Sequence, residues 1–388
     1  MAAGFLMQLL LYNKKEGCFM RKRMLSIWLC LMMVMSILPT VSFAAESDTA
    51  LEGGAKIYVD AVNGDDTTGN GTDTTPYKTV EKAVTAAASG ATIQLGAGNY
   101  TLYGVSSVGH TKGKDLTFVG RGADKTGWNI GAEVPDPANF GTEYNGDYSF
   151  DGAGTITFRN MTLRSGSANY LGFIRANKTV VEDCIINGKT FYWGYTSAEF
   201  TNTTFNCPIV EKTVLGIPYT EGDYALWTYS SPTMTFDTCT FNSSGKVINV
   251  YTDYGAGTHD ITVNFKDCTV KNTANNKQVL NVNDSNMGDY KYILNISGNN
   301  TVSGVPYDET TCSRLYGFGR KAGNNTGRLD VNIDDTLVWQ GGKMVSHKHS
   351  AGEQDNAFTY SYGDWKDNGD GTRTHKVTKT CKYCHYKT

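Results

Sequence analysis

A six-residue unit recurs along the middle of the chain and constrains its fold more than any other feature of the sequence. Apolar residues hold its first and sixth positions, Asn or Asp usually holds the third, and a small or sulfur-containing residue usually holds the fourth. The copies are Phe158–Leu163, Val181–Ile186, Phe200–Phe205, Phe236–Phe241, Phe265–Val270 and, more loosely, Ile333–Val338. Most follow one another at intervals of about 20 to 36 residues, which is typical of solenoid repeats.

The unit predicts a strand, a one-residue corner and a second strand. In an unbroken strand the first and fourth residues would face opposite sides, so they share a face only if the backbone bends at the third. Asn and Asp tolerate the left-handed conformation that such a bend requires. We therefore expect Cys184, Cys239 and Cys268, at the fourth position, to point inward as small soft residues of the interior. A metal or redox ladder is the alternative.

A second pattern lies upstream of each corner. In each four-residue segment the second and fourth residues are bulky, and the third is Gly, Thr or Asn. The segments are Tyr170–Phe173, Tyr192–Tyr195, Leu226–Tyr229, Val247–Val250, Val279–Val282 and Leu315–Phe318. A period of two indicates a strand with one buried face. Together the two patterns predict an all-β fold, a parallel β-helix; an immunoglobulin-like sandwich would not repeat one corner at one register.

The N-terminus has the three-part pattern of a secretory signal peptide. Basic residues at 21–23 precede the apolar run Leu25–Leu38, and the small residues Ser42 and Ala44 suit a cleavage site. We expect residues 1–44 to be removed, with translation starting at Met20, and the mature protein to be secreted or held in the cell envelope. An uncleaved N-terminal anchor is the alternative.

The charge balance argues against a nucleic-acid partner. The chain has 35 basic and 38 acidic residues, and loss of residues 1–44 removes five of the former and one of the latter, which leaves a net charge of −7. A nucleic-acid-binding protein needs a basic surface. No apolar run of about 18 or more residues follows the leader, so we expect no membrane span in the mature chain. The sequence does not indicate an oligomeric state.

The segment before the repeats has a distinctive order of loop, helix start and strand. The Gly/Asp-rich stretch Tyr58–Thr72 leads to Pro76-Tyr-Lys-Thr79, and a Gly-bounded strand lies within Gly90–Tyr100. This order resembles the opening of right-handed parallel β-helix proteins of the pectate-lyase-like superfamily. The resemblance implies a right-handed solenoid over residues 45–345, with a capping helix at roughly Val80–Ala88 across its open end.

The resemblance also raises the question of catalysis. Polysaccharide lyases of this fold use a Lys or Arg base with calcium held by acidic side chains, and hydrolases use clustered Asp residues. Arg175, Asp284 and Arg320 occupy one position of the second pattern on different turns and are the catalytic candidates. Solvated charges at strand ends explain them equally well. No catalytic motif of the superfamily matches residue by residue, so whether the protein is an enzyme stays open.

Aromatic and amide side chains along the same strands suggest a binding surface. Exposed rings can stack on sugars and amides can hydrogen-bond to hydroxyls, whereas packing under loops is the alternative. We expect the protein to bind polysaccharide or host glycans along the side of the solenoid, like an adhesin. A polysaccharide lyase or glycoside hydrolase, and a structural stalk, are the alternatives. The candidate ligand-binding residues are Tyr170, Tyr192, Asn249, Tyr251, Asn281 and Asn283.

Two segments could hold metals, although neither predicts one unambiguously. The loop that contains Asp60, Asn63, Asp65 and Asp66 offers hard oxygen ligands for Ca²⁺, but turn-forming Asp explains it without an ion.

Residues 346–388 resemble the short Trp/His/Cys-x-x-Cys repeats at the C-termini of large surface proteins of Gram-positive gut bacteria, which usually have Gly where this chain has His385. His375, Cys381 and Cys384 could bind Zn²⁺, with His385, or alternatively His347 or His349, as the fourth ligand. A disulfide, free thiols or a c-type haem attachment site are the alternatives.

Overall fold

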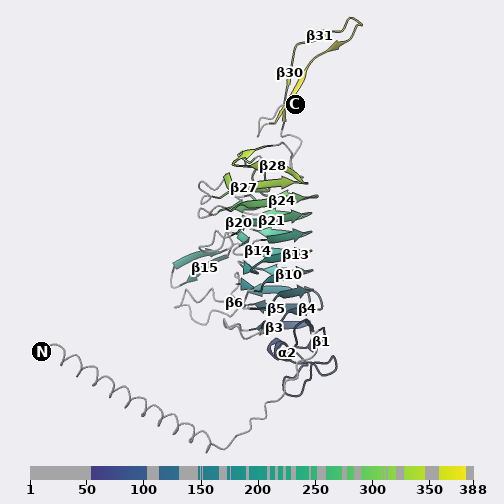
Figure 1. The fold of residues 1–388 in the computed structure, drawn as a ribbon, viewed down its shortest axis with the longest axis vertical. Helices are drawn as coiled ribbons and strands as arrows, with labels where there is room; N and C mark the ends of the chain where they lie inside the picture. The colour runs from purple at the N-terminus through teal and green to yellow at the C-terminus, as the bar shows by residue number, and fades with distance from the viewer. Residues whose placement is uncertain are drawn as a thin grey trace, which may run out of the picture. The chain divides into compact units, whose positions relative to one another are not determined.

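The computed structural model shows a parallel β-helix followed in sequence by a β-hairpin unit (Figure 1). The chain divides into residues 1–49 and 50–388, and every described residue belongs to the second part. The predicted signal peptide, residues 1–44, therefore lies outside the described residues. Those are 54–102, 113–130, 147–148, 150, 152–165, 173–174, 176–188, 192–207, 210–214, 217–221, 224–228, 233–243, 246–250, 259–272, 278–283, 290–308, 310–311, 313–319, 327–345 and 358–381.

The longest sheet runs along one side of the solenoid. Its first ten strands are parallel: β1 (Lys56–Val59), β2 (Ala91–Leu95), β4 (Leu116–Val119), β7 (Thr155–Arg159), β10 (Lys178–Glu182), β13 (Ser197–Thr201), β18 (Thr233–Asp237), β21 (Ile261–Lys266), β24 (Tyr292–Ser297) and β27 (Leu329–Ile333). Two antiparallel strands, β28 (Thr336–Gln340) and β29 (Lys343–Met344), complete it.

The second sheet is formed by the strands that follow the corners. It contains β3 (Gly98–Leu102), β5 (Thr126–Ile130), β8 (Thr162–Ser165), β11 (Ile185–Asn187), β14 (Thr204–Cys207), β19 (Thr240–Ser243), β22 (Thr269–Asn272) and β25 (Thr301–Ser303), all parallel. Sheets of this length in which chain neighbours lie one turn apart are those of a parallel β-helix, so the predicted fold is confirmed.

Shorter sheets complete the turns. One contains β17 (Tyr224–Trp227), β20 (Lys246–Val250), β23 (Leu280–Val282) and β26 (Tyr316–Phe318), and another contains β6 (Asp147–Tyr148), β9 (Phe173–Ile174) and β12 (Tyr192–Trp193). Strands β15 (Val210–Val214) and β16 (Ile217–Glu221) form an antiparallel hairpin.

The corner prediction is confirmed for the first five six-residue units. The third residue of each has a left-handed φ of 46–54°; these residues are Asn160, Asp183, Asn202, Thr238 and Asp267. A backbone with positive φ turns the chain within one residue, so the strands on either side join different sheets.

The sixth unit is not a corner, and this part of the prediction is wrong. Asp334 and Asp335 both have positive φ and join β27 to the antiparallel β28, as in a tight hairpin. The corner of this region is Gly298, with φ 72°, between β24 and β25. Ile296 pairs with Phe265 and Val302 with Val270. Seven residues span this corner instead of six, so a fixed six-residue template misses it.

The core is a stack of identical positions. Phe200 lies parallel to Phe236 at a centroid distance of 5.1 Å, and Phe205 lies parallel to Phe241 at 4.7 Å. The fourth position of each corner is also buried, and it is held by Met161, Cys184, Thr203, Cys239 and Cys268. The predicted inward orientation of the three cysteines is therefore confirmed, and all three are free thiols.

The second pattern is only partly in the predicted register. Ile248, Leu280 and Tyr316 are aligned on successive strands as expected. However, Leu226 pairs with Ile248, one residue away from the predicted alignment, and Phe173 pairs with Tyr192. All of the residues 247–250 are buried, so this strand has no exposed face, contrary to the prediction.

A short helix, α2 (Val80–Ala86), lies at the β1 end of the solenoid, beside β1 and β3 (Figure 1). It begins where predicted and ends two residues earlier. Thr79 caps it by accepting a hydrogen bond from the Lys82 amide at 3.3 Å. Within the described part of the chain, no helix is long and apolar enough to cross a membrane.

The C-terminal unit is a hairpin. Strand β30 (Phe358–Tyr362) pairs with β33 (Val377–Cys381), and β31 (Lys366–Asp367) pairs with β32 (Arg373–Thr374), all antiparallel. The predicted domain boundary at residue 345 stays a prediction.

Candidate functional site

A row of amides crosses the outward face of the longest sheet. Asn264 donates from Nδ2 to Thr235 Oγ1 at 3.0 Å, Asn295 to Asn264 Oδ1 at 2.8 Å, and Asn332 to Asn295 Oδ1 at 2.9 Å. We call Thr235, Asn264, Asn295 and Asn332 the outer amide ladder. All four side chains are half-buried. Each amide has two N–H groups and an oxygen with two lone pairs, so the ladder leaves hydrogen-bonding capacity toward solvent.

The second sheet carries a comparable row. Asn206 donates to Asn187 Oδ1 at 2.9 Å, and Asn242 donates to Asn206 Oδ1 at 2.8 Å. We call these three residues the side amide ladder. It has the same chemistry as the outer amide ladder but lies on a different sheet, and so provides a matched control.

Ion pairs surround the outer amide ladder on the same sheet. Lys266 lies 3.0 Å from Asp237, and Lys291 lies 2.8 Å from Asp330. Hydrogen bonds to these two carboxylates raise the pKa of each lysine. A lysine with a raised pKa stays protonated, so both ion pairs persist at neutral pH.

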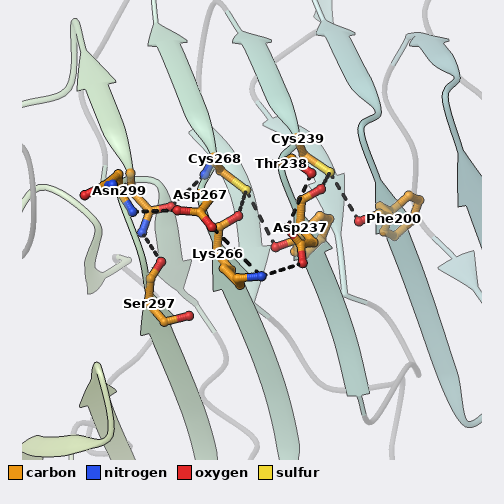
Figure 2. A network of polar contacts seen from close by, with 11 residues as sticks. Phe200, Asp237, Thr238, Cys239, Lys266, Asp267, Cys268, Ser297 and Asn299 are labelled. Carbon is orange, nitrogen blue, oxygen red and sulfur yellow. Dashed lines mark hydrogen bonds and ion pairs between the residues drawn. The ribbon is translucent and has the colours of Figure 1, made fainter.

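The corners between the two long sheets form a continuous polar network (Figure 2). Lys266 bridges Asp237 and Asp267, whose carboxylate accepts a hydrogen bond from the Asn299 amide at 2.7 Å. Behind them the thiols of Cys239 and Cys268 donate to main-chain carbonyl groups. Burial raises the pKa of the Cys184 thiol to about 12 and also raises that of Cys239. Because metal ligation and nucleophilic attack need a thiolate, these cysteines have a structural role.

Two of the predicted ligand-binding amides are not accessible. Asn249 and Asn281 are 3% and 0% exposed, and Asn281 donates to Asn249 Oδ1 at 3.1 Å. The prediction that they contact a glycan is therefore wrong, because their strands are covered on both faces. Asn283, directly after β23, is half-buried. The backbone of Tyr192 lies in β12, whereas Tyr170 and Tyr251 lie outside the described residues.

The buried pair Asn249 and Asn281 leaves one hydrogen-bond acceptor unused. Asn281 Oδ1 is buried and has no hydrogen-bond partner among the described residues. The residue that pairs with Asn281 on the next strand is Gly317, which has no side chain to continue the row. A buried acceptor without a donor is uncommon, and this one lies beside the strand end that precedes Asp284.

The three catalytic candidates, Arg175, Asp284 and Arg320, lie outside the described residues. The described neighbours Asn283 and Gly319 directly follow β23 and β26, which are adjacent strands. The predicted column of three charges stays a prediction.

The acidic loop uses its carboxylates to hold its own backbone. Asp60 accepts from the amides of Val62 and Asn63, both at 2.9 Å, and Asp65 accepts from those of Thr67 and Thr68. These hydrogen bonds lower the pKa of both carboxyl groups.

Asp66 is turned toward the helix start instead. It accepts from the amides of Lys78 and Thr79 at 2.8 and 3.0 Å, and from the Thr79 hydroxyl at 2.7 Å. No three His, Cys, Asp or Glu residues of the described part of the chain gather as metal ligands. The predicted calcium site stays a prediction, and the contacts of these carboxylates account for the loop without an ion.

The zinc prediction combines residues that the hairpin separates. His375 stacks on Tyr362, which pairs with Val377 at one end of β33, whereas Cys381 forms the other end. Four residues of extended strand between Val377 and Cys381 span about 13 Å. The backbones of His375 and Cys381 therefore lie far apart along the hairpin. The side chain of Cys381 and the residues Cys384 and His385 lie outside what the structure describes, so the zinc site stays a prediction.

A feature that the sequence analysis did not single out is a group of exposed rings on the hairpin. Trp365 stacks on His375 at a centroid distance of 4.0 Å, and Tyr362 stacks on His375 at 5.2 Å. Alternation of aromatic and hydroxyl residues in β30 is the signal that could have revealed it.

Comparisons with known proteins do not identify a reaction or a ligand for this chain. A family model described as a protein of unknown function (DUF1565) matches residues 62–106, which include α2 and the acidic loop from Asn63 onward. A search of curated proteins finds no match. Among solved structures, the chain is similar to a rhamnogalacturonan lyase, with 12% sequence identity and a TM-score of 0.41, over 64% of this chain and 69% of that one. Similarity this distant carries no argument about activity.

Proposed function

We propose that the mature protein is secreted or held in the cell envelope and binds polysaccharide or host glycans along the side of the β-helix, as an adhesin does. The observation that carries this proposal is the outer amide ladder. Its rungs lie on successive strands, about 4.8 Å apart, and the bonds within the ladder hold each amide in one orientation. A linear glycan lying along the ladder would meet prearranged donors and acceptors, so little side-chain entropy would be lost on binding.

The charge of the chain narrows the choice of glycan. The net charge is −3 for the whole sequence, and it becomes more negative if the leader is removed. A negatively charged protein repels polyanions over several ångströms. Neutral glycans are therefore the preferred ligands.

A polysaccharide lyase or glycoside hydrolase is the second candidate. The specific observation in its favour is that Asn283 and Gly319, which directly precede Asp284 and Arg320, follow adjacent strands. If Asp284 and Arg320 lie beside each other as their neighbours do, an acid and a base would be in place for proton transfer to and from a sugar.

The test is size-exclusion chromatography of the mature protein with three kinds of polymer: neutral glycans released from mucin, then pectins, and then glycosaminoglycans. Calcium is present throughout. We compare Asn264→Ala/Asn295→Ala with the matched variant Asn206→Ala/Asn242→Ala, after thermal unfolding shows that both fold. Wild-type protein is expected to co-elute with intact neutral glycan. Loss of the outer amides should weaken binding about tenfold or more, because two hydrogen bonds of about 1 kcal/mol each are removed.

Each other result has a definite meaning. Equal weakening by both double variants would contradict a site on the outer amide ladder. Shortened polymer would favour the enzyme and direct mutagenesis to Asp284 and Arg320. If polymers neither shorten nor co-elute, the protein is better explained as a structural stalk.

A further inference from the structure

The C-terminal hairpin has one aromatic face and one hydroxyl face. Successive residues of a strand point to opposite sides, so Tyr360 and Tyr362 of β30 share a face with their partners Lys379 and Val377 on β33. Thr and Ser residues of both strands occupy the other face. We call Tyr360, Tyr362 and Trp365 the aromatic face.

The aromatic face is uncovered. Tyr360, Tyr362 and Trp365 are 53%, 65% and 62% exposed. Throughout residues 359–380 every side chain is exposed or half-buried, so the rings do not serve as a core. Large exposed aromatic groups that cluster in this way mark an interaction site.

The ring geometry favours a flat ligand. Trp365 and His375 are inclined by only 13°, and Tyr362 and His375 by 22°, at centroid distances of 4.0 and 5.2 Å. Parallel rings fix one another's orientation, so the outer ring faces are prearranged. Tyr and Trp combine a broad apolar surface with a polar edge, which suits a ligand that is apolar on its face and hydroxylated at its rim.

The area of the aromatic face decides between a second protein chain and a small ligand. A fully buried aromatic side chain covers about 150–250 Å², so three rings with these exposed fractions offer about 300–400 Å². Two copies packed face to face would bury roughly 700 Å², whereas stable protein interfaces bury about 1,200 Å² or more. A second copy is therefore not held by this face alone. Two or three sugar rings fit it well.

We propose that the aromatic face is a second glycan-binding site, which stacks the sugar rings of a neutral glycan on Tyr360, Tyr362 and Trp365. This rests on the proposed function and extends it to the C-terminal unit. Residues 358–381 contain three Asp and four Lys or Arg, so the charges nearly balance and no polyanion is strongly attracted. The carboxylate of Asp364 is exposed and could accept hydrogen bonds from sugar hydroxyls, whereas that of Asp367 already accepts from the Gly369 amide and lies 4.0 Å from Arg373.

Acrylamide quenching of tryptophan fluorescence in the full mature protein provides a local test. Trp128, Trp193 and Trp339 are buried, Trp365 is open to the quencher, and the side chain of Trp227 lies outside the described residues, so its signal has to be subtracted. The difference between wild type and Trp365→Phe therefore isolates the hairpin signal. The probes are a neutral soluble glucan and neutral mucin oligosaccharides, with pectin as the charged comparison. Neutral probes are expected to lower the Trp365 quenching constant at least twofold.

The variants separate this site from the solenoid. Tyr362→Ala should raise the glycan concentration needed for half-maximal protection about tenfold, whereas Tyr195→Ala, which removes an exposed ring of the solenoid, should leave that concentration unchanged. The double variant Asn264→Ala/Asn295→Ala should also leave it unchanged.

If no neutral probe protects Trp365, or if Tyr362→Ala has no effect, the hairpin proposal is wrong even when the protein still co-elutes with glycan. Protection of Trp365 without any effect of the solenoid variants on co-elution would instead overturn the proposed function and leave the hairpin site standing.

Discussion

The thiol of Cys239 donates a hydrogen bond to the main-chain carbonyl of Phe200, one turn earlier in the solenoid, across an S···O distance of 3.4 Å. Thr203 donates from its hydroxyl to the Val181 carbonyl, also at 3.4 Å, and so repeats this relationship one turn before. From Cys184 to Cys268 the fourth corner position therefore holds a small side chain with a hydrogen-bond donor, whereas the first corner has Met161. Thiol and hydroxyl are equivalent in this role, which explains why Thr203 stands between Cys184 and Cys239.

Replacement of Cys239 tests this equivalence. Cys239→Thr should retain the hydrogen bond and change the free energy of unfolding by less than about 1 kcal/mol, whereas Cys239→Ala should destabilise by about 1–3 kcal/mol because the donor and packing are lost. Urea unfolding followed by circular dichroism measures both. If Thr and Ala are equally destabilising, the hydrogen bond is not what the position requires.

Thr238 is the one β-branched residue among the five confirmed corner positions. Its φ is 54°, a region that a β-branched side chain enters only with strain and that Asn tolerates. We expect Thr238→Asn to stabilise the protein by about 1 kcal/mol. The reciprocal variant Asn202→Thr, at the preceding corner with φ 46°, should destabilise by a similar amount. Thermal unfolding of the two variants checks this, and shifts of the same sign would contradict it.

The corners were predictable from sequence because local backbone strain dictates their residues. Asn160, Asp183, Asn202 and Asp267 occupy a position that few other residues accept, so the same signal returns on most turns. The corner at Gly298 was not predicted because it contains one extra residue, although Gly adopts the left-handed conformation as readily as Asn or Asp.

The sites were harder to predict because exposure depends on what covers a strand. Asn249 and Asn264 look alike in sequence, yet Asn249 is buried and Asn264 only half-buried. Burial of each side chain depends on which distant segments of the chain pack against its strand. The alternation of residues within one strand does not reveal those segments.

Cys184 should make stability depend on alkaline pH. Burial raises the pKa of its thiol from about 9 to about 12, so the folded state favours the protonated form. Its contribution is fully present below pH 9 and is lost as the pH rises toward 12, because the unfolded chain releases the proton first. Between pH 8 and 10.5 the stability advantage of wild type over Cys184→Ser should fall by about 2 kcal/mol. Urea unfolding at the two pH values measures this, and a constant advantage would contradict the buried, protonated thiol.

Asp66 should stabilise the helix start rather than a metal ion. Its carboxylate accepts hydrogen bonds from the amides of Lys78 and Thr79, directly before α2. Asp66→Ala should destabilise the protein by about 1–3 kcal/mol, as expected for hydrogen bonds to a charged group. Asp65→Ala loses contacts only within its own exposed turn, so it should lower the free energy of unfolding by less than Asp66→Ala does.

The same two variants separate this role from calcium binding. Because the carboxylates already accept main-chain hydrogen bonds, the unfolding temperature of wild type should be the same in excess EDTA and in millimolar calcium, and Asp66→Ala should lower it equally in both. A calcium-dependent increase in wild type that disappears in Asp66→Ala would show that the carboxylate leaves the helix start to bind an ion, and would restore the calcium site that the acidic loop first suggested.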